Sequence, residues 1–163
     1  MLTATQALIF LPFVLPICIW VAWSDLASML IPNKAVIALF LVWVLIGVII
    51  IPFKAWLWGF GLCGIMLVAG FVFNAAGVLG AGDAKFGAAM APFFIGTDYR
   101  FSGMFLAACL ISALIAHRLL RMVPAMRRAT PGWKSWTVPK DFPVGLSLAG
   151  MLIFYLILRL IVA

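Results

Sequence analysis

Long apolar runs separated by short polar turns constrain this chain more than any other feature. A helix needs about 20 apolar residues to cross the hydrocarbon core of a bilayer. Five runs approach or reach that length and a shorter one lies between the third and the last two, at residues 6–24, 35–51, 56–78, 86–96, 101–120 and 143–161. Hydrophobic residues make up 67% of the chain and charged residues 9%, which excludes an ordinary soluble domain and a disordered chain. The sequence therefore predicts an all-α, polytopic membrane protein with six transmembrane helices in a single domain, residues 1–163.

The basic residues predict how this bundle is oriented. Six spans put both termini on one side, and the turns after the first, third and fifth spans then share the other side. That other side receives most of the 11 basic residues, including Lys34, Lys85, Arg127 and Arg128. Because positive residues collect on the cytoplasmic side, we expect both termini to be periplasmic. No Lys or Arg precedes Asp25, so the first run is expected to be a retained helix and not a signal peptide.

The net charge of +7 bears on the partners of the protein. Since the basic residues follow the predicted topology, they indicate contact with anionic membrane lipids and not with nucleic acid. Acidic residues are rare, and there are only four: Asp25, Asp83, Asp98 and Asp141. Asp98 is expected in an outer turn and Asp141 at the start of the last span. Four dispersed acids do not form a metal site, so we expect no metal ion and no cofactor.

Asp25 and Asp83 form the candidate catalytic pair. Asp25 closes the first predicted span and Asp83 opens the fourth, so the topology brings both to the cytoplasmic edge. Two carboxyls a few Å apart cannot both ionise, and one therefore keeps its proton. The ionised member can activate water while the protonated member polarises a carbonyl group. The pair therefore predicts a hydrolase with an aspartic mechanism.

The residues around Asp83 suggest how it is positioned. Gly80 and Gly82 allow unusual backbone angles and leave room for a substrate strand. We expect Asp83 to cap a helix that begins at Ala84, which favours its ionised form and leaves the proton on Asp25. Lys85 points to a different face of that helix. It either extends to lipid headgroups or steadies the loop or a substrate carbonyl.

These residues resemble a known family. Asp25 followed by Ile31-Pro32-Asn33, the G-x-G-D-x-K motif at 80–85 and a Pro-Val-Gly sequence at 143–145 are similar to the type IV prepilin peptidases. The similarity is greatest to the small kind that serves Tad/Flp pili and lacks a cytoplasmic insertion with methyltransferase activity. The G-x-G-D signature is shared with presenilin-type intramembrane proteases. The resemblance therefore implies a membrane aspartic protease of the G-x-G-D type.

The resemblance also implies an activity and a location. It implies an endopeptidase of the inner (cytoplasmic) membrane that removes the short basic leader from prepilins at the cytoplasmic face. Its substrates would be prepilins, and the pilus assembly machinery is a further candidate partner. Asp25 and Asp83 take the catalytic roles by this resemblance. The residues expected to shape the site around them are Gly80, Gly82, Lys85, Pro143 and Gly145.

Two functions of other classes remain open from the sequence. A small proton-coupled transporter or channel would use buried acids as a proton relay, with the acids near the middle of the spans. A noncatalytic subunit of a pilus or secretion machine would tolerate Asp→Asn changes. The single histidine, His117, is expected at the membrane interface beside Arg118. The three cysteines lie within apolar runs and are expected to be buried free thiols: Cys18, Cys63 and Cys109.

Overall fold

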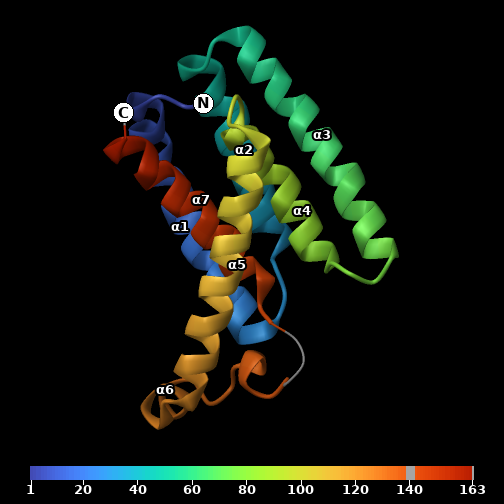
Figure 1. Ribbon diagram of the computed structural model, residues 1–163, viewed down its shortest axis with the longest axis vertical. Helices are drawn as coiled ribbons and strands as arrows, with labels where there is room; N and C mark the ends of the chain where they lie inside the picture. Colours follow the sequence, from blue (N-terminus) through green and yellow to red (C-terminus); the bar gives the residue numbers. More distant parts are fainter. Residues whose placement is uncertain (139–141, 163) are drawn as a thin grey trace.

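The computed structural model describes residues 1–138 and 142–162, and within these ranges the chain is helical without β-strands (Figure 1). Lys140 and Asp141 lie outside the described residues, so the expectation for Asp141 is not tested. The elements are, in chain order, α1 (Ala4–Ser28), α2 (Asn33–Ile50), α3 (Phe53–Ala75), α4 (Ala81–Met90), the 3-10 helix η1 (Ala91–Phe94), α5 (Tyr99–Met122), α6 (Pro124–Ala129), the 3-10 helix η2 (Lys134–Trp136) and α7 (Val144–Ile161).

Five helices in the described part of the chain are long and apolar enough to cross a membrane: α1, α2, α3, α5 and α7. Proline and polar residues at the turns set their ends. Pro32 and Pro52 precede α2 and α3 in extended conformations, because proline lacks the N–H that a helix interior requires. The Asp98 carboxylate caps α5 by accepting a hydrogen bond from the Arg100 N–H at 2.6 Å.

The expected fourth span is shorter than the others, so the prediction of six transmembrane helices is not confirmed. α4 has 10 residues, and a helix of that length covers about 15 Å, half of a hydrocarbon core. The run that follows Lys85 contains Pro92, at which α4 gives way to η1, and it ends at Gly96 with a φ of +67°. Together α4 and η1 pack along α3, which they follow in the opposite direction (Figure 1).

Both termini lie at one end of the bundle, and the α6 segment lies at the other (Figure 1). Near the termini, Arg159 Nε donates a hydrogen bond to the Leu2 carbonyl at 2.7 Å. The Tyr155 hydroxyl lies 3.0 Å from the Thr97 hydroxyl in the same region. This arrangement agrees with the prediction that the two termini lie on the same side. Which compartment that side faces stays a prediction.

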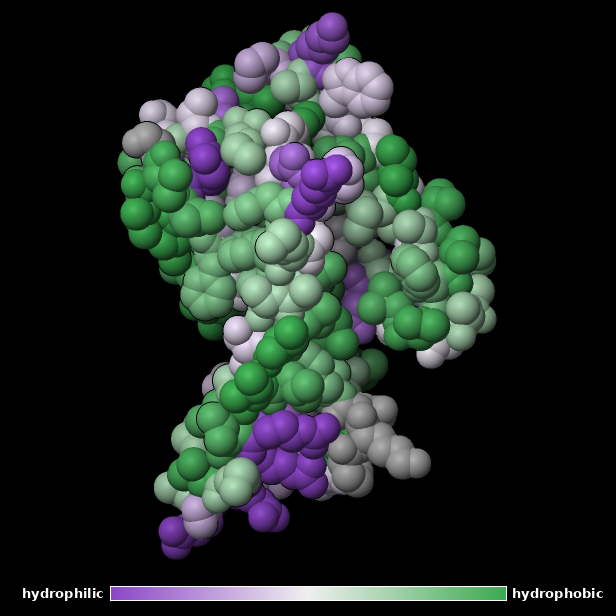
Figure 2. Space-filling view, viewed as in Figure 1, coloured by the Kyte–Doolittle hydropathy of each residue, from purple (hydrophilic) through white to green (hydrophobic). Residues whose placement is uncertain are grey.

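The two halves of the bundle are packed differently. α7 packs against α1 along most of its length and buries Leu152, Tyr155 and Leu156. Beside them, the rings of Phe10, Trp43 and Phe93 form an aromatic core with centroid distances of 5.0–5.9 Å. In contrast, α3 buries only two residues, both glycines, and many of its other apolar side chains form part of the outer surface (Figure 2).

Candidate active site

Asp25 lies inside α1, one turn before its end. The sequence predicted that the first span stops at Asp25, but α1 continues to Ser28 and the Asp25 carbonyl accepts a hydrogen bond from the Met29 N–H at 2.9 Å. The side chain is 5% exposed. Its Oδ2 accepts a hydrogen bond from the backbone N–H of Leu146, in the first turn of α7, at 3.3 Å. The α1–α7 packing therefore holds this carboxylate in place.

Asp83 is the third residue of α4, and the prediction that it caps the helix is wrong. The N-cap is Gly80, and no side chain there accepts a hydrogen bond. One oxygen of Asp83, Oδ1, is buried and has no hydrogen-bond partner among the described residues. The other, Oδ2, folds back over the start of the helix, since a Cβ added at Gly80 would lie 2.6 Å from it. This carboxyl is therefore partly enclosed yet has a free oxygen.

The two carboxyls influence each other. Burial and, to a smaller extent, the charge of the nearby Asp25 together raise the pKa of Asp83 from 3.8 to about 6. Asp25 has a backbone N–H donor, which favours its ionised form, whereas no donor to the Asp83 carboxyl occurs in the described part of the chain. The backbone donor at Asp25 supports a proton on Asp83, opposite to the assignment expected from capping, and which carboxyl holds the proton stays a prediction. Protons on such a coupled pair belong to both groups together.

Ile31 fills the space between the first turns of α4 and α7. A Cβ added at Gly145 would lie 2.8 Å from Ile31 Cδ1 and 2.8 Å from Asp25 Oδ2. A Cβ added at Gly82 would lie 3.2 Å from Ile31 Cβ. The two glycines therefore permit a close approach of three chain segments around Asp25. Pro143, directly before α7, is its N-cap residue in an extended conformation.

Lys85 does not lie beside the carboxyl pair. Its Nζ donates a hydrogen bond to Asn33 Oδ1 at 3.4 Å, at an exposed position. Because Asn33 begins α2, this contact connects α4 to the turn after α1. Of the options expected from the sequence, the geometry favours a residue that steadies the loop. The Leu146 N–H and the Ile31 side chain were missed as site residues, because neither a backbone donor nor an aliphatic side chain gives a chemical signal.

His117 is buried among protein side chains, with 1% of its surface exposed, and its expected position at the membrane interface stays a prediction. Its ring stacks on Trp136 at 5.1 Å, and Trp136 stacks on Trp133 at 5.5 Å. Trp133 in turn contacts Trp23 of α1 edge to face at 5.1 Å. These rings attach the segment after α5 to the end of α1. No group of three or more metal-ligating side chains occurs in the described residues. Of the cysteines, Cys63 is only partly buried.

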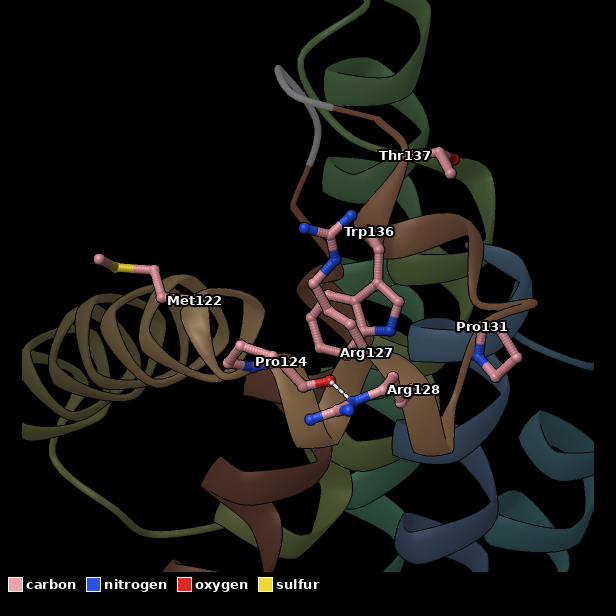
Figure 3. Close-up of a pocket in the computed structure, with 7 residues that line it drawn as sticks. All are labelled: Met122, Pro124, Arg127, Arg128, Pro131, Trp136 and Thr137. Carbon is pink, nitrogen blue, oxygen red and sulfur yellow. Dashed lines mark hydrogen bonds between the residues drawn. The ribbon is translucent and has the colours of Figure 1, made fainter.

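A separate basic cavity of about 480 Å³ lies in the segment after α5 (Figure 3). The Arg127 side chain lies beside the Trp136 ring, and Arg128 Nε donates a hydrogen bond to the Pro124 carbonyl at 3.4 Å (Figure 3). Neither Asp25 nor Asp83 lines this cavity. Its described lining residues include two arginines and no general base, so they lack the groups that hydrolysis requires. The carboxyl pair is therefore the candidate active site.

A comparison with protein-family profiles gives a match. A family profile described as the type IV leader peptidase family matches residues 12–117, which is more than half of the 163-residue chain. The matched segment includes Asp25, Asp83 and the Ile31-Pro32-Asn33 sequence between them. Comparisons with curated proteins and with solved structures gave no significant match.

Proposed function

The chain belongs to the type IV leader peptidase family, and from this premise we propose that it is a membrane aspartic endopeptidase whose catalytic residues are Asp25 and Asp83. The family and the apolar helices indicate a multi-pass inner-membrane protein with prepilins as substrates. The observation that carries the proposal is the packing of Asp25 and the first turn of α4 around Ile31, with a buried, unpaired oxygen on Asp83, an acid 58 residues after Asp25.

The proposed reaction divides the work between the two carboxyls. Asp25, ionised and oriented by the Leu146 N–H, takes a proton from a water molecule as the water attacks the scissile carbonyl carbon. Protonated Asp83 donates a hydrogen bond to the carbonyl oxygen, which becomes negatively charged. When the tetrahedral intermediate collapses, the C–N bond breaks and the proton held by Asp25 passes to the leaving amine. The pair returns with one proton, ready for another cycle.

The surrounding residues have supporting roles in this proposal. Gly80 leaves room for the Asp83 carboxyl and Gly82 for the Ile31 side chain, and Gly145 lets α7 approach Asp25. Pro143 sets the start of α7, and Lys85 steadies α4 against the turn before α2. Cleavage takes place at the cytoplasmic face, where the basic segment after α5 lies, and both termini are periplasmic. The substrate is the leader of a Tad/Flp-type prepilin.

A cleavage assay in membranes tests this proposal. Wild type, Asp25→Asn, Asp83→Asn and Asp98→Asn proteins are compared at matched expression with a prepilin substrate. Asp98 is the matched control, because it is an acid that caps α5 near the other end of the bundle. We expect wild type and Asp98→Asn to shorten the substrate and the other two variants to leave it whole. Cleavage by both Asp25→Asn and Asp83→Asn would contradict the catalytic assignment.

A further inference from the structure

A groove lies between α3 and α5 on the membrane-embedded side of the bundle. Its volume is about 360 Å³, and the residues that form its floor are Gly87, Met90, Ala91, Leu148 and Met151 of α4, η1 and α7. Leu62 and Met66 of α3 form one wall. Ser102, Gly103 and Leu106 of α5 form the other. None of the residues that line it is charged, so it suits an apolar occupant.

The groove begins on the face of α4 that carries Asp83. An α-helix turns about 100° per residue, so Gly87 lies about 40° from Asp83 around the helix and Met90 about 20° from it on the other side. A second gap, between α2 and α3, is lined by Lys85, Ala88 and Ala89, which lie about 120–160° from Asp83. That gap is therefore on the opposite face of α4. Of the two, only the groove between α3 and α5 lies on the same face of α4 as Asp83.

The α7 residues in the floor of the groove also lead away from the carboxyl pair. Gly145 lies against Asp25, and Leu148 and Met151 follow it at intervals of three residues, about one turn each. α4 and α7 both start at the carboxyl pair and pack against each other. Their successive turns therefore form one continuous surface that leads from the site into the apolar part of the bundle.

The groove is open to the outside of the bundle, and two of its lining residues are glycines, which place no side chain in it. A Cβ added at Gly87 or at Gly103 would meet no atom within 4 Å. Met66, on the α3 wall, is 44% exposed. In a membrane this opening faces lipid, so a helix can enter it sideways from the bilayer. A lipid tail is also apolar and could occupy the groove, but nothing in its chemistry would direct it to a pair of carboxyls.

We propose that this groove is the docking site for an apolar, bilayer-embedded helix of the substrate. The helix packs its side chains over Gly87 and Gly103, and the extended segment at its end enters the space beside Asp25 and Asp83. This inference rests on the proposed peptidase function and adds to it a place where the substrate is recognised. In this proposal α3 and α5, which carry no catalytic residue, bind the substrate helix.

Leucine substitutions in the groove test the proposal. Gly87→Leu and Gly103→Leu place a side chain in the groove without a clash at Cβ. Gly64→Leu is the matched control, because its Cβ also meets nothing within 4 Å and it lies on α3 outside the groove. We expect both groove variants to raise the KM for a membrane-embedded prepilin by about tenfold or more, and the control to cleave as wild type does.

The outcomes separate this proposal from the proposed function. Wild-type KM in both groove variants, or a loss confined to kcat, would overturn the docking site while leaving the peptidase intact. A wild type that cuts no prepilin would overturn the function, and the docking site with it. As a second measurement, a photoreactive side chain at position 103 in the Asp83→Asn protein is expected to crosslink to the substrate, and one at position 64 is not. Crosslinks at 103 only to lipid or to a second copy of this chain would overturn the proposal.

Discussion

Asp25 and Asp83 come from two differently packed halves of the molecule. Asp25 lies on α1, which packs along α7 in the tightly buried half, and its carboxylate accepts the Leu146 N–H. Asp83 lies on α4, which is packed mainly on the sparsely buried α3, and its Oδ1 has no partner in the described part of the chain. In the proposed mechanism, this difference corresponds to a base held by a backbone donor and an acid whose Oδ1 remains available to the substrate.

The largest effect is expected from the pair itself. We expect Asp25→Asn and Asp83→Asn each to lower kcat at least about 10³-fold, since each removes proton transfer at the reacting atoms. Because the two act as one unit, the double variant should be no more than about tenfold worse than either single variant. Cleavage kinetics of all three proteins check this. Losses that multiply in the double variant would show that the two halves act independently.

A change beside the fixed carboxyl should have the next largest effect. In Gly145→Ala the new Cβ would lie 2.8 Å from Asp25 Oδ2 and 3.0 Å from its Cγ, so the carboxylate must move. We expect cleavage to fall about 10- to 100-fold, as is usual when a reacting group is displaced by about 1 Å. Gly150→Ala, on the same helix with its nearest neighbour at 3.6 Å, is the control. Equal activity of the two variants would show that the position of Asp25 is not fixed.

A change at the contact between α3 and α4 should lower activity less. In Gly70→Ala the new Cβ would lie 2.8 Å from Ala84 Cβ, so α3 and α4 must separate slightly. Overpacking of this kind costs about 1–3 kcal/mol, and we expect cleavage to fall about three- to tenfold because the closest contact is with Ala84 and not with the Asp83 carboxyl. Thermal unfolding in detergent and cleavage kinetics check this against Gly64→Ala. A loss as large as that of Gly145→Ala would remove the distinction between the halves.

The smallest effect is expected at Lys85. Its hydrogen bond to Asn33 is long, at 3.4 Å, and exposed, and such bonds contribute little in water. We therefore expect Lys85→Met to lower cleavage by no more than about threefold. Michaelis–Menten kinetics on the prepilin measure it. A loss of about 100-fold or more would indicate that Lys85 contacts the substrate directly, contrary to the geometry.

The long helices were predictable from the length of their apolar runs, although α1 continues through Pro12 and Pro16. A helix beginning at Ala84 was expected, but its start at Ala81 was not, since the first turn of α4 packs against α3 at Gly70. The two acids were identified from their rarity and from the residues around them. The Leu146 donor and the burial of His117 under Trp136 depend on contacts between residues distant in the sequence, which no local pattern encodes.

The pH dependence of cleavage tests the central claim most directly, namely that one carboxyl is protonated and the other ionised. Burial raises the pKa of Asp83 to about 6, so it keeps its proton below that pH and loses it above. We expect a bell-shaped kcat/KM profile for the wild type, with activity falling as the pH rises through about 6 and falling again in acid as Asp25 becomes protonated. A profile that is flat between pH 4 and pH 8 would contradict the shared proton and, with it, the catalytic pair.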